Sequence, residues 1–190
     1  EALSALTGWP CTMVAFSRPG FDPDVLWATL VSSKKAGFLS ACGTHRSRDP
    51  SIQPFHIYAL LDVLEVNDRT AGKVVGLLKI RNPNGRTKWN GDWSDDSNRW
   101  TIESRLAAGC PLGGTPGVFF IAYSDFLRHF AHVTICPIRN DWHEERWPIS
   151  LPSSKEPSIG VAFGASETTE CTISLVQPES RGRRGPPREG

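Results

Sequence analysis

The chain has no long hydrophobic run, no Asn-x-Ser/Thr acceptor and no pronounced charge of either sign. Its apolar stretches fall well short of the roughly 18 residues that a membrane-spanning helix requires. No charged and then apolar leader is present. The formal net charge is +1, which gives no electrostatic argument for nucleic acid or an anionic membrane. We therefore expect a protein that binds neither nucleic acid nor membranes, and a reducing, cytoplasmic location.

The five cysteines, at positions 11, 42, 110, 136 and 171, form no CxxC pair, so neither a zinc knuckle nor a redox motif is indicated. A zinc site built from His129, His132, Cys136 and His143 has to be weighed, since these residues fall within 15 positions. They pass from a helix end into a strand, where neighbours alternate between faces. We therefore expect no metal or other cofactor in this chain.

The sequence is instead rich in Gly (17), Pro (15) and Trp (7), which indicates a loop-rich fold whose interior is filled by large aromatic side chains. Asp22, Pro23 and Asp24 predict the start of a helix that Gly37 ends, followed by a loop over 41–54. Alternating and continuous apolar residues predict strands over 56–66, 73–80, 117–123 and 132–138, with a short helix over 126–130 capped by Ser124 and Asp125. The pattern predicts an α+β fold, a mainly antiparallel sheet with peripheral helices.

Three segments follow this region. The composition changes at 148–158, PISLPSSKEPS, which predicts a linker. Two strand-like segments within 159–178 could open a separate, truncated β domain, and the basic 179–190 tail is expected to be disordered. A solvated end is the ordinary interpretation of the tail, and a nucleic-acid or targeting role is the alternative. Because the first residue is Glu1 and not Met, we expect the chain to begin inside a longer protein.

His56 and Asn82 are the candidate catalytic residues. His56 opens the first strong strand, and Asn82 ends the next one. If these strands pair as a hairpin, both side chains lie at the same rim of the sheet. An Asn oxygen can orient an imidazole whose other nitrogen holds a thiol as thiolate. Taken alone, a His at the start of a strand is more often a partly buried structural residue, and an Asn before Pro-Asn-Gly is usually a turn former.

Several motifs together resemble the calpain family of cysteine proteases. HIYALLDV at 56–63 resembles the histidine strand of that family, and LLKIRNPNGRTKWNGDWSD at 77–95 resembles its asparagine segment. GVFFIAYSDFLRHFAHVTIC at 117–136 is similar to the stretch that closes the catalytic core. EALSALTG and LWATLVSSKKAGFLSACG are similar to its entry helices. ICPIRNDWHEER at 135–146 fits the small-optic-lobes (calpain-15-like) type.

The resemblance implies a papain-like fold in which residues 1–147 form the second, His/Asn subdomain of the catalytic core. It makes His56 the general base and Asn82 its orienting residue in an intracellular cysteine endopeptidase. The nucleophilic cysteine belongs to the preceding subdomain, so this chain alone is expected to be inactive. Its partners are then protein substrates and that cysteine-bearing subdomain. Cys42 matches a non-catalytic cysteine of the family.

Two departures from the family favour an alternative, a catalytically inactive calpain-like scaffold or interaction module. Asn84 replaces the tryptophan that shields the His–Asn hydrogen bond from water. The second departure is at the family's calcium site: Lys88, Pro116 and Val118 stand where carboxylates are expected, although Asp95 remains. We therefore expect the calcium site of this subdomain to be eroded, while calcium could still bind elsewhere in the full-length protein.

Overall fold

The structure is a computed structural model that describes residues 2–47, 49–85, 87–149, 160 and 162–175. The chain divides into two compact units, Glu1–Asp141 and Trp142–Gly190. All helices and strands that the structure describes lie in the first unit. They are α1 (Ala2–Thr7), β1 (Thr12–Ala15), α2 (Pro23–Lys35), β2 (Leu39–Gly43), β3 (Ile57–Asp68), β4 (Lys73–Arg81), α3 (Ile102–Ala108), β5 (Val118–Ala122), α4 (Tyr123–His129) and β6 (His132–Cys136).

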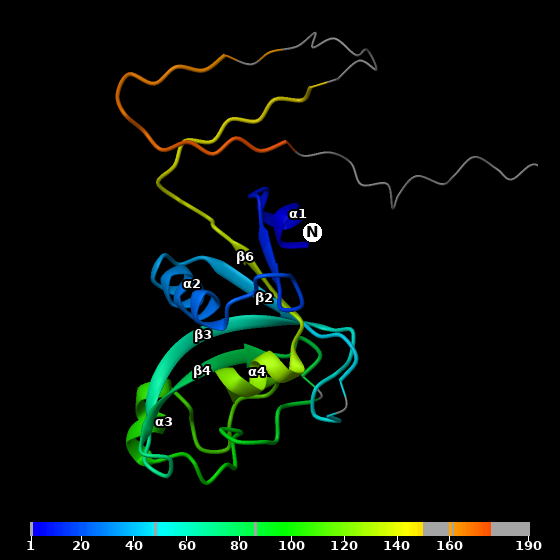
Figure 1. The fold of residues 1–190 in the computed structure, drawn as a ribbon, viewed down its shortest axis with the longest axis vertical. Coiled ribbons are helices and arrows are strands. Elements are labelled where there is room, and N and C mark those ends of the chain that lie inside the picture. The colour runs from blue at the N-terminus through cyan, green and yellow to red at the C-terminus, as the bar shows by residue number, and fades with distance from the viewer. Residues whose placement is uncertain (1, 48, 86, 150–159, 161, 176–190) are drawn as a thin grey trace, which may run out of the picture. The chain divides into compact units, whose positions relative to one another are not determined.

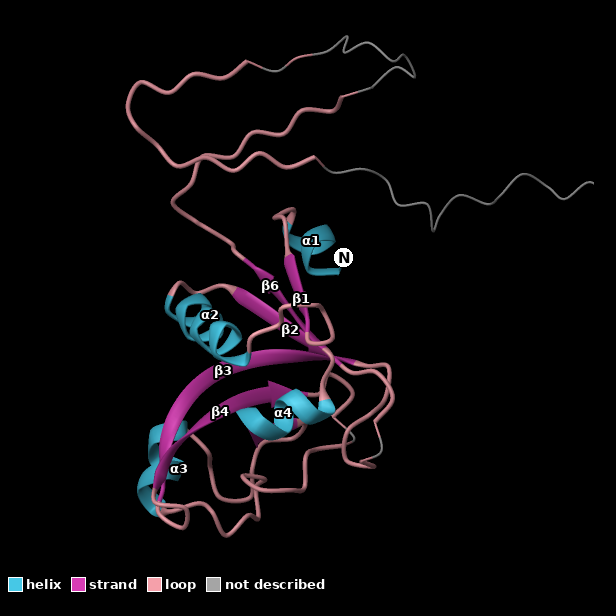
Figure 2. Ribbon diagram, in the orientation of Figure 1, coloured by secondary structure: helices cyan, strands magenta, loops and turns pink. Residues whose placement is uncertain are grey.

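The strands form one six-stranded sheet in the order β1-β6-β2-β3-β4-β5. Every neighbouring pair is antiparallel, and the long β3–β4 hairpin is the central feature in Figure 1. Helices lie around these strands (Figure 2). The predicted α+β class with a mainly antiparallel sheet and peripheral helices is confirmed.

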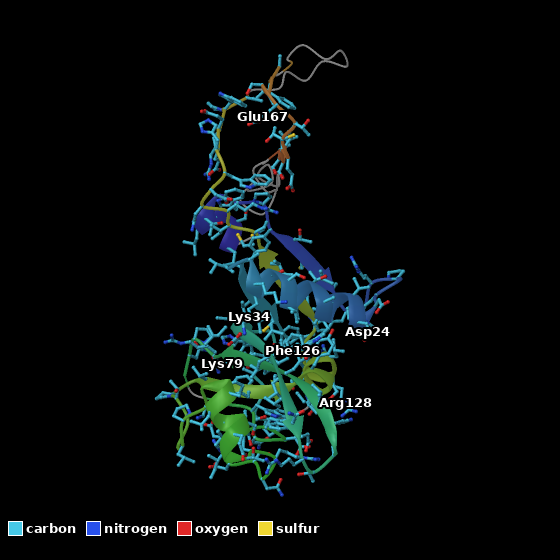
Figure 3. The ribbon with its side chains drawn as sticks, turned by 90° about the vertical axis from the view of Figure 1, so that its left-hand side faces the viewer. Asp24, Lys34, Lys79, Phe126, Arg128 and Glu167 are labelled. Carbon is cyan, nitrogen blue, oxygen red and sulfur yellow. The ribbon has the colours of Figure 1, made fainter. Side chains whose placement is uncertain are left out.

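Each face of the sheet is buried by different elements. Because side chains alternate along a strand, Phe119 and Ile121 of β5 pack on one face, and Phe120 and Ala122 on the other. The first face is covered by α2 and α4, and the second by α3. The Trp-rich loop between β4 and α3 (residues 82–101) contributes Trp89 to the first cluster and Trp93 and Trp100 to the second. On α4 the side chain of Phe126 points into the interior while Arg128 projects outward (Figure 3).

A register shift between Leu60 and Asp62 changes which residues of β3 face each side. Tyr58 and Leu60 lie in the first cluster, and after the shift Val63 does so too, whereas Val66 joins the second. An extra residue in one strand lets β3 contribute to both cores along its length.

The helix predicted after Asp22 is confirmed as α2. Asp22 Oδ1 accepts from the backbone N–H groups of Asp24 (2.8 Å) and Val25 (3.3 Å), and Gly37 has a φ of +73° beyond its end. The predicted strands correspond to β3, β4, β5 and β6, each with slightly different bounds.

Three local predictions are wrong. Residues 41–43 belong to strand β2 and not to a loop, because they pair on both sides with β3 and β6. Helix α3, capped by Thr101 and ended by Gly109, lies before β5, where the sequence pattern predicted no helix. Ser124 and Asp125 do not cap α4, which begins at Tyr123 directly from the extended Ala122.

The domain predictions beyond Trp147 stay predictions. Most of the predicted linker and the whole predicted tail lie outside the described residues. The structure assigns no strand to the described residues of 159–178, at 160 and 162–175. None of the helices in the described part of the chain combines the length and hydrophobicity that a bilayer crossing requires.

Candidate active site

His56 and Asn82 lie at one rim of the sheet, immediately before β3 and immediately after β4. The antiparallel pairing of Ala59 with Arg81 brings these two strand ends together. The His56 Nε2 and Asn82 Oδ1 atoms are 3.0 Å apart, a hydrogen-bond distance. The arrangement that the hairpin predicted is therefore present, and the catalytic roles of the two residues stay predictions.

The orientation of the Asn82 amide determines which ring nitrogen of His56 carries the proton. Asn82 is 1% exposed, and its Nδ2 donates to the backbone O (3.1 Å) and the Oγ1 (3.0 Å) of Thr87. Its Oδ1 therefore faces His56, and it also accepts from Asn84 N–H (3.0 Å). Because an amide oxygen can only accept, His56 Nε2 must carry the proton, which leaves Nδ1 with a lone pair in the neutral ring.

The backbone of His56 is held by Thr44. His56 N donates to Thr44 Oγ1 (3.0 Å), and Thr44 N donates to His56 O (3.0 Å). Thr44 Oγ1 also lies 2.8 Å from Gln53 O, so one buried hydroxyl ties together both ends of the loop before His56. The preceding residue, Phe55, adopts a φ of +50°, unusual for a side chain other than Gly, and its N donates to His45 O.

Tyr58 supports the histidine ring from the core side. The rings of His56 and Tyr58 are 4.8 Å apart at an interplanar angle of 81°, an edge-to-face contact that favours one ring orientation. The Tyr58 hydroxyl accepts from Gln53 N (2.8 Å), and burial raises the pKa of this phenol. His56 is thereby held by Asn82 at one ring atom and by Tyr58 at its edge.

Cys42 is not placed to act as a nucleophile. Its side chain is buried in the first core cluster and its Sγ lies 3.9 Å from Tyr58 O. Burial alone raises the pKa of the Cys42 thiol far above its usual range. Because the thiolate is the reactive form, such a buried thiol is inert. The interpretation of Cys42 as a non-catalytic residue agrees with this geometry.

Asn84 is exposed at the same rim of the sheet. Its Nδ2 lies 3.3 Å from Gln53 Oε1, so two polar side chains meet beside the His56–Asn82 pair. Polar groups attract water where an indole would exclude it, and a higher local dielectric weakens a hydrogen bond. The His56–Asn82 pair is therefore buried on the side of Asn82 and exposed to solvent on the side of Asn84.

The acidic residues of the Trp-rich loop are paired with cations of the chain. The Lys88 ammonium forms an ion pair with the Asp95 carboxylate, and the Arg105 guanidinium donates to Asp95 O. Asp92 is paired with Arg99 (3.1 Å). Calcium requires six to eight oxygen ligands. Here the carboxylates of Asp95 and Asp92 already form ion pairs with Lys88 and Arg99. Among the residues that the structure describes, no group of three or more His, Cys, Asp and Glu could hold a metal ion.

Of the remaining histidines of the first unit, two face each other and the third packs on a tryptophan. The His129 ring packs on Trp89 at 5.1 Å, whereas His132 faces the His45 ring at 6.3 Å. Burial, and secondarily the charge of His45, lower the pKa of His132. Cys136 contacts Thr7 Oγ1 at 3.3 Å. Different neighbours therefore surround three of the four residues that were considered as a zinc site: His129, His132 and Cys136.

Sequence reasoning did not find Thr44, Gln53 or Thr87 as residues around the pair. Thr87 follows Asn82 by five positions, a spacing at which a turn can fold back on itself, and this was the available signal. Thr44 and Gln53 come from the loop before β3, whose path is set by tertiary contacts. Tyr58 could have been singled out, because it lies two residues after His56 and so on the same side of the strand.

Most of the chain is similar to known proteins. Residues 1–137 match the calpain family cysteine protease domain. The chain is 30% identical over 148 residues to the calpain-type cysteine protease ADL1 of rice (Oryza sativa subsp. japonica), covering 73% of this chain and 7% of that protein. It is 31% identical over 146 residues to human calpain-9, covering 68% of this chain and 20% of that protein. It is 33% identical over 87 residues to the mouse calpain-2 catalytic subunit, covering 45% and 12% respectively.

The chain thus spans at most about a fifth of the length of these relatives. The matched segment contains all six strands, the four helices and the His56–Asn82 contact. The chain belongs to the calpain family of cysteine proteases.

Proposed function

We propose that this chain is the His/Asn-bearing half of the catalytic core of a calpain-type cysteine endopeptidase, with its nucleophilic cysteine outside the chain. The observation that carries the proposal is the 3.0 Å contact between His56 Nε2 and Asn82 Oδ1. It uses one ring nitrogen and leaves Nδ1 for a thiol. Among the described residues no hydrogen bond is made to that Nδ1.

In the proposed mechanism the incoming thiol gives its proton to His56 Nδ1, and Asn82 stabilises the imidazolium through the Nε2 hydrogen bond. The thiolate attacks the peptide carbonyl carbon. The His56 Nδ1 proton passes to the leaving amine, which gives an acyl-enzyme. His56 then removes a proton from water, whose oxygen attacks the thioester and releases the acid and the thiol.

The test is proteolysis by the protein that contains this chain together with its cysteine-bearing half. We expect His56→Ala to reduce thiol-dependent peptide cleavage by several orders of magnitude. His129→Ala is the matched control, because His129 packs on Trp89 and not on Asn82. Equal activity in the two variants would defeat the proposal. The isolated 190-residue chain should cleave nothing.

The finer features of the proposal concern the subtype and the surroundings of the core. The segment 135–146, ICPIRNDWHEER, supports the small-optic-lobes (calpain-15-like) type. On this proposal residues 1–147 are the core subdomain, 148–158 a linker and 159–178 the start of a β domain. Protein substrates and the cysteine-bearing subdomain are the partners, and the cytoplasm is the location.

The second candidate is an inactive calpain-like scaffold, favoured by the polar Asn84–Gln53 contact beside the pair. The sequence upstream decides between the two candidates. A Cys at the start of a helix, preceded by a Gln, favours the enzyme, and any other residue at that position favours the scaffold.

A further inference from the structure

Two of the five free thiols lie at adjoining ends of neighbouring strands: Cys11 directly precedes β1, and Cys136 is the last residue of β6. Strands β1 and β6 are antiparallel, with Thr12 opposite Ile135. One step further along the same register, Cys11 stands opposite Cys136. Residues directly opposite each other point to the same face of a sheet. The two sulfurs therefore share one side of the β1–β6 pair, 125 residues apart in the sequence (136 − 11).

The hydrogen-bond pattern shows which kind of pair this is. Phe16 N donates to Ala131 O (2.9 Å), which makes this a hydrogen-bonding position of the β1–β6 ladder, although Ala131 N donates to Gly43 O (2.8 Å) and not back to Phe16. Hydrogen-bonded and non-hydrogen-bonded pairs alternate along an antiparallel ladder. Counting five steps back from Phe16 makes Cys11 and Cys136 a non-hydrogen-bonded pair. In such pairs the Cα atoms are about 4.5 Å apart, within the roughly 4.4–6.8 Å that a disulfide spans.

The local contacts agree with two adjoining thiols. Cys136 is fully buried and Cys11 is partly exposed. Burial, and then the neighbouring Cys136 thiol, raise the pKa of Cys11 to about 11. Cys11 Sγ lies 3.6 Å from Trp9 O, and Cys136 Sγ lies 3.3 Å from Thr7 Oγ1. The other three cysteines lie on different elements: Cys42 in β2, Cys110 after α3 and Cys171 in the second unit.

We propose that Cys11 and Cys136 are an oxidative modification site, at which a small disulfide such as glutathione disulfide converts the two thiols into a cross-strand disulfide. The Cys11 thiolate, the more accessible one, attacks one sulfur of the reagent and expels the first glutathione thiolate. The Cys136 thiolate then attacks the Cys11 sulfur and expels the second. Both protein protons end on the released glutathione, so the reagent is reduced by two electrons.

The bond would fasten the end strand β1 to β6 and close a loop of 125 residues (136 − 11). Cross-links over long loops restrict the unfolded chain most. Because little of the Cys11 thiol is ionised near neutral pH, the reaction is slow there and accelerates as the pH rises. Exposed Cys171 has no thiol opposite it in a paired strand, and it should acquire glutathione without forming this link.

The experiment treats the folded chain with excess glutathione disulfide at alkaline pH, blocks remaining thiols with N-ethylmaleimide, and maps peptides by mass spectrometry without reduction. We expect a linked Cys11–Cys136 peptide pair with the mass of both peptides less two hydrogens. The link should disappear in Cys11→Ser and persist in Cys171→Ser. Cys136→Ala, if it folds, should leave stable glutathione on Cys11.

The oxidised protein should also unfold at a higher temperature than the reduced protein, and Cys11→Ser should lose that increase. Stable glutathione on Cys11 of the unmodified sequence, with Cys136 still reacting with maleimide, would overturn the proposal. So would a link that joins Cys11 or Cys136 to another cysteine instead, or the absence of any link after all of Cys171 has reacted.

Discussion

Asn82 Oδ1 lies 3.0 Å from His56 Nε2, and the same amide donates from its other end to Thr87. The buried amide thereby connects the histidine at the start of β3 with the loop after β4. Its orientation makes Nε2 the protonated ring nitrogen and leaves Nδ1 as the base. The chemistry that we propose depends on this one arrangement.

Asn82→Ala should destabilise the isolated chain by about 1–3 kcal/mol, because it removes the buried amide and leaves the partly buried Thr87 O and Oγ1 without their donor. Denaturant unfolding followed by fluorescence of the buried tryptophans measures this. Asn84→Ala is the matched control, since Asn84 is exposed and should change the free energy of unfolding by less than about 0.5 kcal/mol. An equal loss in both variants would contradict the burial argument.

Thr87→Val should lower kcat/KM of the active protein by roughly 2- to 10-fold, the value of one hydrogen bond. The variant removes the Oγ1 acceptor and keeps the backbone oxygen, so Asn82 is loosened but not released. Thr87→Ser keeps a hydroxyl and should restore most of the activity. If Ser and Val variants were equally impaired, Thr87 would matter only for packing.

At Phe55 the backbone is in the left-handed region while the ring is 71% exposed. Phe55→Gly and Phe55→Val both remove the ring, so their difference reports the backbone. Gly adopts this φ freely, whereas a β-branched residue does not, and we expect Phe55→Gly to be more stable by about 1–2 kcal/mol. Thermal unfolding of the two variants measures this, and a more stable Val variant would contradict the strained conformation.

Because of His132, the free energy of unfolding of the chain should decrease in mildly acidic solution. Burial and the nearby His45 lower its pKa in the folded state, so below pH about 6.5 the unfolded chain takes up a proton that the folded chain resists. The free energy of unfolding then decreases until the pH passes below the folded pKa. His132→Gln should remove this part of the pH dependence, measured by denaturant titrations at several pH values. An unchanged slope in that variant would assign it to other groups.

Calcium at about 1 mM should leave the unfolding temperature of the chain unchanged relative to a chelator. The Lys88 ammonium already neutralises Asp95, whose side chain is 14% exposed. Lys88→Met should therefore cost about 1–2 kcal/mol, whereas Arg69→Met, which breaks an exposed pair with Glu103, should cost less than about 1 kcal/mol. Saturable calcium binding, measured by calorimetry, would contradict the expectation that the calcium site of this subdomain is eroded.

The hairpin and the candidate pair could be predicted from the sequence because they depend on local patterns. Alternating apolar residues mark β3 and β4, and the pairing of two adjacent strands brings His56 and Asn82 to one rim. The capping of α2 by Asp22 is equally local. In these cases neighbouring residues in the sequence carry the structural information.

The remaining features depend on distant partners. Residues 41–43 of β2 are small and have weak strand preference, and they become a strand because β3 and β6 flank them. Thr44 and Gln53 meet His56 only after the loop before β3 folds back. Helix α3 did carry a local signal, the Thr101–Ser104 capping box followed by Gly109, and the Trp-rich composition around it masked that signal.

The reactivity of the nucleophilic cysteine tests the central proposal most directly, in the protein that joins this chain to its cysteine-bearing half. Its rate of alkylation by iodoacetamide is measured against pH, with and without His56→Ala. With His56 intact, the thiolate should persist well below neutral pH, as expected beside an imidazolium. In His56→Ala, the midpoint should rise toward about 8.5, the value of a free thiol. Superimposable profiles would show that His56 does not act on that thiol and would contradict the account.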